Sequence, residues 1–422
     1  MKLHVYGAAL ATALALTACG SGSGGGEPAD GKTKIVFSYW GSDSRQKLTE
    51  QAIKKFEEKN PTITVEGDFS DWDSYYEKLA TKVAADDAPD VMSIEIRGLA
   101  EYAGRGALAD LSGGKINVAD LDQQVITAGQ VDGKQYAIPS GVNTFAMIAN
   151  KATIEAAGQK LPDDKTWTWD DYVSLAQKIS EKNAGKIYGT EYNYNPAFLQ
   201  IFAAQRGEKL YDGAKIGVTA DTLKAWWALL QKLVDTKAGP VPAKMSEATT
   251  KPDLSLLATN TGAMGTWWSN QLGTLSKSSG QELTVIRTPK AQGAASSGMF
   301  LQPAMYYTAS AKSEHAAEAD KFIDFLVNDP DAAAILLSDR GLPTNAKVLA
   351  AVKDKLPPTD QKTLAFIDEV RADLTPVQVP PKGAMQMEDI FKRNSEEVLF
   401  GKATPDAGAQ KLLSEANAAL AG

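Results

Sequence analysis

Two hydrophobic periods alternate along residues 34–94, and this alternation limits the possible folds more than any other feature of the chain. Residues 34–40 are rich in β-branched and aromatic side chains, and residues 62–69 have an apolar residue at every second position, so both predict strands. Residues 44–60 and 76–83 have apolar side chains at helical spacing, and 90–94 predicts a third strand. This order predicts an α/β fold with a mostly parallel sheet and helices on both faces.

The rest of the chain continues with helices and strands. The Asp132-Gly133 pair within residues 131–139 predicts a hairpin. Trp226 and Trp227 stand among leucines at helical spacing, so we expect them in the core. Trp167 and Trp169 lie at a predicted helix start and are also expected to be structural. Further helices are predicted at 169–179, 222–234, 316–328, 360–371 and 407–421, and strands at 262–268 and 283–286.

The composition excludes several classes of function. The chain of 422 residues has a net charge of −8 and no basic block, which argues against nucleic acid as a partner. With one Cys and two His, the chain offers neither an internal disulfide nor a Cys-rich zinc site. The loop after the first strand lacks the dinucleotide motif G-x-G-x-x-G, and no P-loop motif is present. We therefore predict no cofactor and no metal.

The N-terminal residues predict an export signal. One cation, Lys2, precedes an apolar run from Val5 to Ala18, which is shorter than the roughly 20 residues of a membrane span. The run ends in Leu-Thr-Ala-Cys, which resembles a bacterial lipobox, so residues 1–18 are expected to be a signal peptide and Cys19 to carry a lipid. Residues 19–33 predict a flexible Gly/Ser tether. The expected location is extracytoplasmic, with the lipid on Cys19 anchoring the chain to the cell membrane.

Short motifs spread over nearly the whole chain beyond this tether resemble those of one family. The chain resembles the family 1 extracellular solute-binding proteins of bacterial carbohydrate ABC importers, of the maltodextrin-binding type. Each motif is weak alone, and the resemblance rests on their order and spacing. The motifs are residues 35–45, DDAPDV at 86–91, GALADL at 106–111, YAIP at 136–139, ANK at 149–151, TWDDY at 168–172, GAM at 262–264, WWS at 267–269 and GLPT at 341–344.

This resemblance implies the two-lobed type II periplasmic-binding-protein fold, with a ligand cleft between two discontinuous α/β lobes joined by a hinge. Lobe one would comprise residues 34–142 and 297–342, and lobe two residues 143–296 and 343–422. The segments near 139–141, Gly298 and Gly341 are hinge candidates. The implied protein is a monomer without enzymatic activity. It would capture a mono- or oligosaccharide by hinge closure and deliver it to the permease subunits of an ABC transporter.

Aromatic and polar residues in the predicted loops suit a sugar. A sugar offers C–H faces to aromatic rings and hydroxyl groups to polar side chains. Ligands of such sheets collect where the strands end. The candidate aromatic contacts are Trp40, Trp72, Tyr192, Tyr194, Trp267 and Trp268, the last two being favoured by the family resemblance. The candidate polar contacts are Asp43, Arg45, Glu95, Arg97, Asn143 and Arg340.

The sequence leaves three alternatives open. Arg45, Arg97 and Arg340 together could bind an acidic or sulfonated sugar or another anion. A secreted glycosidase would need two carboxylates about 5–10 Å apart, and acidic residues are plentiful. A surface adhesin would have no closing cleft. The sequence names neither the sugar nor its length or linkage.

Overall fold

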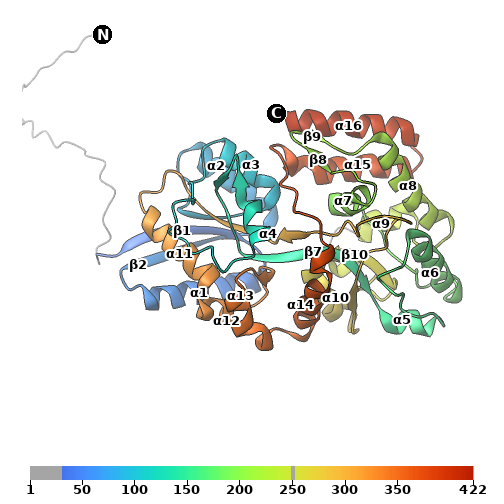
Figure 1. The fold of residues 1–422 in the computed structure, drawn as a ribbon, viewed down its shortest axis with the longest axis horizontal. Helices are drawn as coiled ribbons and strands as arrows, with labels where there is room; N and C mark the ends of the chain where they lie inside the picture. The colour runs from blue at the N-terminus through green and yellow to red at the C-terminus, as the bar shows by residue number, and fades with distance from the viewer. Residues whose placement is uncertain (1–30, 249–251, 422) are drawn as a thin grey trace, which may run out of the picture.

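Two α/β lobes lie side by side in the computed structural model, which describes residues 31–248 and 252–421 (Figure 1). Each lobe has its own sheet and its own hydrophobic core. The predicted α/β class and two-lobed architecture are confirmed. The predicted signal peptide, Cys19 and all of the predicted tether except residues 31–33 lie outside the described residues.

The first sheet begins with the predicted strand–helix–strand–helix–strand unit. β1, β2 and β3 are parallel, and β1 lies between the other two. β13 comes from much later in the chain and pairs antiparallel with both β3 and β6. In spatial order the strands are β2 (Ile63–Ser70), β1 (Thr33–Trp40), β3 (Val91–Ile94), β13 (Tyr306–Ala309) and β6 (Ile138–Pro139).

Helices cover both faces of this sheet with separate cores. On one face, the Phe322 ring of α11 packs edge-on against Phe37 of β1 and Phe56 of α1. On the other face, Trp40 at the end of β1 packs against Tyr75 of α2. The first face carries α1 (Asp43–Lys59), α11 (Ala316–Asn328) and α12 (Pro330–Leu336), and the second carries α2 (Trp72–Ala84) and α3 (Ile96–Gly104). α13 (Ala346–Val352) packs on α12, although its residues fall in the range predicted for lobe two.

The second sheet is built around β7 (Gly141–Ala149), which is buried along its whole length. Its first half pairs with β12 (Leu301–Pro303) and β14 (Leu342–Pro343), and its second half with β10 (Met264–Trp268) and β11 (Thr284–Ile286). β10 and β11 confirm the predicted strands. All these pairs are antiparallel, whereas the first sheet has two parallel and two antiparallel pairs. The expectation of a mostly parallel sheet therefore holds only for β1, β2 and β3.

Helices surround the second sheet. Trp226 and Trp227 of α8 are fully buried, as their spacing predicted, and the Trp227 indole donates to Ser395 Oγ of α15 at 2.9 Å. Trp167 and Trp169 are also buried. The predicted later helices are confirmed, with ends that differ by a few residues. The helices of this lobe are α5 (Lys151–Ala156), α6 (Trp169–Lys182), α7 (Pro196–Ala204), α8 (Ala220–Asp235), α9 (Pro242–Ala248), α10 (Leu272–Ser279), α14 (Pro358–Val370), α15 (Met387–Leu399) and α16 (Pro405–Ala421).

Short elements join these larger ones. β4 (Gln130–Val131) and β5 (Lys134–Gln135) confirm the predicted hairpin, and Asp132 and Gly133 in its turn both have positive φ, 51° and 78°. A second hairpin comprises β8 (Tyr211–Asp212) and β9 (Lys215–Ile216). The remaining short helices are α4 (Gln123–Ile126), η1 (Thr127–Gly129), η2 (Pro252–Leu254), η3 (Ser269–Gln271), η4 (Lys353–Lys355), η5 (Arg371–Asp373) and η6 (Ala384–Gln386).

Three chain segments pass close together between the lobes. They connect β6 to β7, β12 to β13, and α12 to β14. The Ser140 N–H donates to the Met305 carbonyl at 3.0 Å, and the Ala304 N–H donates to the Gly141 carbonyl at 2.8 Å. The first two segments are therefore held together by backbone hydrogen bonds where they leave one sheet for the other.

Two of the three hinge candidates lie at this crossing. A Cβ on Gly141 would lie 2.2 Å from the Arg340 carbonyl oxygen, so the close approach of the third segment requires glycine there. Gly341 has a φ of +82°, which also favours glycine. Gly298 lies ahead of β12 and packs on α7, where a Cβ would be 2.4 Å from the Ile201 carbonyl oxygen. Its surroundings therefore belong to the second lobe.

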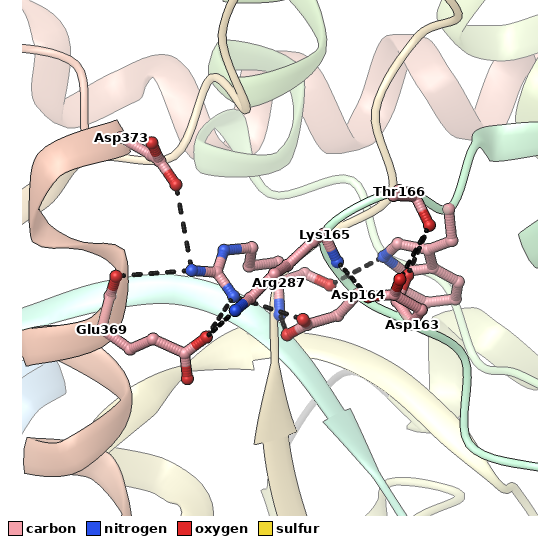
Figure 2. A network of polar contacts seen from close by, with 8 residues as sticks. Asp163, Asp164, Lys165, Thr166, Arg287, Glu369 and Asp373 are labelled. Carbon is pink, nitrogen blue, oxygen red and sulfur yellow. Dashed lines mark hydrogen bonds and ion pairs between the residues drawn. The ribbon is translucent and has the colours of Figure 1, made fainter.

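A buried arginine connects α14 to the body of the second lobe (Figure 2). Arg287 follows β11, and its Nη1 lies 3.2 Å from Asp164 and 2.9 Å from Glu369, with Asp373 3.8 Å from Nη2. Burial alone would lower the pKa of Arg287, but the neighbouring carboxylates raise it above its ordinary value. The network joins three segments that are far apart in the sequence, and all of them lie in lobe two.

Candidate functional site

A cavity of about 630 Å³ lies between the lobes. The first lobe contributes residues 95–97 at the start of α3, and Gln302 of β12 reaches the cavity from the crossing. The second lobe contributes residues 191–197 and α7, the end of β10, residues 210–211, and the stretch from residue 378 into α15. Six of the predicted ligand contacts line this cavity, namely Glu95, Arg97, Tyr192, Tyr194, Trp267 and Trp268.

Two adjacent tryptophans at the end of β10 form one wall of the cavity. Trp267 and Trp268 are both half-buried, so part of each ring stays accessible. Pairing between β10 and β7 places Trp267 opposite Ala146 and Trp268 opposite Phe145. The Phe145 ring supports Trp268 edge-on, with ring centroids 5.1 Å apart. The register of β10 therefore sets the backbone position of both rings.

The polar and aromatic loop at 189–196 forms a neighbouring wall. Tyr192 and Tyr194 line the cavity but are almost fully buried, and their rings pack edge-on with centroids 6.1 Å apart. The Tyr192 hydroxyl donates to the Pro240 carbonyl at 3.1 Å. Burial raises the pKa of both hydroxyls, so both stay neutral in the physiological range.

A carboxylate in this loop was not selected from the sequence. Glu191 is only 3% exposed, and the Trp267 indole N–H donates to its Oε1 while the Leu256 backbone N–H donates to Oε2 at 2.6 Å. Burial raises the pKa of Glu191 to about 7, and the hydrogen bonds lower it only in part. A Cβ on Gly265 would lie 2.5 Å from Oε1, so the glycine in the GAMG stretch is the one sequence signal of this contact.

Charged side chains from both lobes meet at the cavity. Arg97 of lobe one lies 2.8 Å from Glu388 of α15 and 2.9 Å from Glu95, the N-cap residue of α3. Burial alone would lower the pKa of Arg97, but the two carboxylates raise it. Asp389 and Lys392 of α15 also line the cavity. Together with the buried carboxylate of the loop, the lining has four carboxylates and two cations.

Carboxamides complete the lining, and they too were missed in the sequence. The Gln378 carbonyl oxygen accepts from two backbone N–H groups at 3.1 and 3.3 Å, which leaves its NH₂ group as a donor. The Gln271 oxygen accepts from the Trp268 N–H at 3.3 Å. Gln200 and Gln302 line the cavity as well. Glutamines occur throughout soluble proteins, so nothing in the sequence marks these for a site.

Two predicted aromatic contacts lie in lobe one behind the cavity wall. Trp40 is buried, and its ring packs against Trp72 and Tyr76. Trp72, at the start of α2, is 41% exposed. The Tyr76 hydroxyl accepts from the Glu95 N–H at 2.8 Å, so this aromatic cluster supports the residue that lines the cavity.

The other predicted polar contacts do not line the cavity. Arg45 and Arg340 share the carboxylate of Asp339, at 2.8 and 3.2 Å. Asn143 is buried in β7, in register with β12, and Asp43 is exposed in the first turn of α1. The structure therefore does not bring Arg45 and Arg340 to Arg97. Whether any residue of the predicted set contacts a ligand stays a prediction.

The cavity lining combines aromatic rings with polar side chains. Ring faces lie beside hydrogen-bond donors and acceptors, and several of these polar groups are held in place by backbone contacts. Within residues 31–248 and 252–421, no group of three or more His, Cys, Asp and Glu side chains is placed to hold a metal ion. No helix in this part of the chain combines the length and the apolar character needed to cross a bilayer.

Two lobes joined by adjacent crossing segments, with a cavity of rings and polar groups between them, define a two-lobed binding protein. Residues 51–363 match the family model of the bacterial extracellular solute-binding proteins, and the chain belongs to this family. The resemblance inferred from the short motifs is thus confirmed at the level of the family. The family is one of binding proteins that act outside the cell.

Individual relatives and one solved structure fit this assignment. An uncharacterized lipoprotein in the oleD 5′ region of Streptomyces antibioticus is 27% identical over 356 residues, covering 81% of this chain and 76% of that protein. The diacetylchitobiose binding protein DasA of Streptomyces coelicolor is 28% identical over 233 residues, about half of each chain at 51% and 54%. A periplasmic oligogalacturonide binding protein of Yersinia enterocolitica, solved with saturated digalacturonic acid, superposes with a TM-score of 0.81 at 20% identity, covering 92% of this chain and 99% of that one. This last likeness shows the fold alone.

Proposed function

We propose that this protein captures a mono- or oligosaccharide outside the cell and delivers it to the membrane subunits of an ABC transporter. The observation that carries the proposal is the wall of Trp267 and Trp268 beside the carboxamides of Gln271, Gln302 and Gln378. Ring faces suit the C–H faces of a sugar, and carboxamides match its hydroxyl groups as donors and acceptors. The cavity volume of about 630 Å³ lies within the usual range for small-molecule sites, roughly 300–1,000 Å³. The relative that binds diacetylchitobiose adds support.

The charges around the cavity favour an uncharged saccharide over an acidic one. Arg97 is already paired with Glu95 and Glu388, which leaves Lys392 as the second cation of the lining. The other arginines of the predicted anion site contact Asp339 away from the cavity. An acidic sugar would bring its own carboxylates close to four others, and such crowding of like charge is costly.

We further propose binding without catalysis. A glycosidase needs one carboxyl group free to give a proton and a second free to act as base or nucleophile. Glu95 and Glu388 are both paired with Arg97, and both oxygens of Glu191 accept hydrogen bonds. Recovery of the bound saccharide unchanged after long incubation is the expected result, and released shorter sugars would contradict it.

The proposed working cycle combines closure with a membrane tether. Ligand contacts from both lobes exist together only when the lobes are close, so a saccharide would shift the population towards the closed form. We propose that a lipid on Cys19 holds the monomer at the membrane, within reach of the permease. Replacing Cys19 by Ser should move the protein from the membrane fraction to the soluble fraction; unchanged membrane association would contradict the anchor.

The test is a thermal-shift screen of residues 20–422 against diacetylchitobiose, an arabinooligosaccharide, acarbose and digalacturonic acid, before and after unfolding and refolding to remove any carried-over ligand. A ligand concentration of 100 times Kd stabilises the folded state by about 2.7 kcal/mol, which raises the melting temperature by a few degrees. We expect a shift with at least one of the first three sugars, none with digalacturonic acid, and loss of the shift in Trp267→Ala and Trp268→Ala. A shift with digalacturonic acid alone would support the anion alternative, and no shift with any sugar would contradict the receptor.

A further inference from the structure

Glu191 is a carboxylate that the fold has buried at some cost. Its side chain is 3% exposed, and both oxygens accept hydrogen bonds from N–H groups, one from Trp267 and one from Leu256. Among the described residues, no cationic side chain pairs with it. Burying a carboxylate without a cation is unfavourable. We therefore ask what its hydrogen bonds contribute to the stability of the fold or to the structure of the site.

The hydrogen bond to Trp267 reaches directly into the cavity wall. Pairing of β10 with β7 fixes the backbone of Trp267 opposite Ala146, but strand pairing leaves the rotation of the side chain undetermined. The indole N–H is the only polar group of that side chain, and Glu191 accepts its proton. Gly265 leaves room for the carboxylate, since a Cβ there would lie 2.5 Å from Oε1. The backbone at Gly265 thus leaves space for the Glu191 carboxylate, and the carboxylate in turn accepts a hydrogen bond from the Trp267 ring.

We infer that Glu191 is a positioning residue of the saccharide site, and that its ionised carboxylate holds the Trp267 ring in the orientation on which a sugar stacks. This inference rests on the proposed function. Both oxygens accept from N–H donors, and a neutral carboxyl group is a weaker acceptor than a carboxylate, so a proton on Glu191 would weaken the hydrogen bond that holds Trp267. The orientation of Trp267, and with it the affinity for saccharide, should therefore depend on pH.

The surroundings of Glu191 allow this dependence to be attributed to it. On its own loop the neighbour is Tyr192, whose hydroxyl is directed to the Pro240 carbonyl. From α6, Tyr172 donates to or accepts from Thr190 at 2.6 Å, and its pKa is raised by burial and, to a smaller extent, by the charge of Glu191. From β10 and from residues 252–263 before it, the groups that contact the Glu191 carboxylate are the N–H donors of Trp267, Leu256 and Leu257. Tyrosines stay neutral across neutral pH, whereas burial raises the pKa of Glu191 to about 7.

The first experiment needs no ligand. The protein labelled with ¹⁵N-tryptophan is titrated from pH 5.5 to 8.5, and the indole N–H signal of Trp267 is assigned by its absence in Trp267→Phe. We expect this signal to move with a midpoint near pH 7, to move no longer in Glu191→Gln, and to move as in the wild type in the control Tyr172→Phe. A Trp267 signal that does not change over this range in the wild type would overturn the inference.

The second experiment is a double-mutant cycle on affinity, using the tightest-binding saccharide of the screen above. A ring interaction of about 1.4 kcal/mol corresponds to tenfold in Kd. We expect Kd to rise about tenfold from pH 8.5 to 5.5 in the wild type, and Glu191→Gln and Trp267→Phe to weaken binding and to abolish this pH dependence. The Kd of the double variant should be no higher than that of the single variant with the higher Kd, because both changes break the same hydrogen bond. Additive losses would overturn the positioning role.

The outcomes separate this inference from the proposed function. If no saccharide binds at any pH while the Trp267 signal still titrates, the receptor proposal fails and the Glu191–Trp267 coupling stands. If saccharide binds with the same Kd at every pH, the receptor stands and the inference fails. Should Glu191→Gln fail to fold, the wild-type titration and the Trp267→Phe variant still decide the question.

Discussion

Arg97 and Arg287 share one chemistry but differ in how their partners are distributed over the two lobes. Each guanidinium lies between carboxylates, Arg97 between Glu95 and Glu388, and Arg287 next to Asp164 and Glu369. The carboxylate partners of Arg287, which Figure 2 shows around its guanidinium, all come from segments of lobe two. Glu388, in contrast, faces Arg97 from the opposite lobe.

This difference separates stability from closure. An ion pair within one lobe exists whenever that lobe is folded, so its free energy adds to folding. An ion pair between lobes exists only while the lobes are close, so its free energy adds to the closed population and through it to ligand affinity. Breaking the ion pair within one lobe should therefore lower the free energy of unfolding and leave ligand affinity unchanged. Breaking the ion pair between the lobes should weaken ligand affinity and leave the free energy of unfolding unchanged.

The largest expected effect is on folding. Arg287→Ala leaves the partly buried Asp164 without its cation, and we expect the free energy of unfolding of lobe two to fall by about 3 kcal/mol. Urea denaturation followed by circular dichroism measures this, and the Kd for saccharide should stay the same. The control is Arg393→Ala, which removes an exposed pair with Glu415 in the same lobe and should cost less than about 1 kcal/mol. Equal losses in the two variants would contradict the role of the buried network.

The second effect is a pH dependence of the free energy of unfolding. Neither arginine changes charge between pH 5 and 8, so the two ion-pair networks do not obscure the titration of Glu191. The pKa of Glu191 is about 7 in the folded protein, above its ordinary value of 4.5. The folded state therefore holds this proton more tightly, so the stabilisation is fully present below pH 4.5 and is lost as pH rises through 7. We expect the free energy of unfolding to fall by about 2.5 kcal/mol between pH 5 and 8 from this group. Urea midpoints at four pH values should show this fall in the wild type and not in Glu191→Gln.

The third effect is on affinity. Glu388→Gln removes the carboxylate that faces Arg97 across the cavity, and we expect Kd for saccharide to rise by several-fold, about 1 kcal/mol, with an unchanged urea midpoint. Isothermal titration calorimetry measures the change. Glu397→Gln on the same helix is the matched control, because its partner Lys411 lies in the same lobe at 2.6 Å. If both substitutions change Kd alike, the ion pair across the lobes does not favour closure.

The smallest expected effect is the loss of a helix cap in lobe two, and it gives a reference for the loss of folding free energy in Arg287→Ala. Thr168 and Asp171 form a capping box at the start of α6, in which each side chain accepts from the backbone N–H of the other residue. Thr168→Ala should cost about 1 kcal/mol of folding free energy and leave Kd unchanged. Thermal unfolding and a binding titration on the same sample check both. A loss as large as that of Arg287→Ala would mean that the buried network adds nothing beyond a local cap.

The fold was predictable where the signal is local. Periodicity along residues 34–94 predicted β1, α1, β2, α2 and β3, because apolar spacing follows from the geometry of each element alone. Spacing also placed Trp226 and Trp227 in the core. The sheet around β7 was not predictable in this way. Its partners come from residues 264–268, 284–286, 301–303 and 342–343, and no local pattern encodes which distant strands pair.

The candidate site was predictable only in part. Trp267 and Trp268 line the cavity, as do Glu95 and Arg97, which follow a parallel strand where loops converge. Arg45 follows β1 by the same logic, yet its guanidinium turns to Asp339 instead. Glu191 and the glutamines went unselected, because a polar residue in a loop has no periodic signature and acquires its role only from the groups that surround it.

The amino-acid sequence by itself determined the elements, their order, the core tryptophans and the family, all of which depend on neighbours along the chain. Only the tertiary structure decided which charges meet. Arg97 lies against Glu388, 291 positions away, and Arg287 against Glu369, 82 positions away. The physical reason is that a side-chain contact depends on position in space to within a few ångströms. In a protein whose chain crosses repeatedly between two lobes, that position is set by the packing of distant segments.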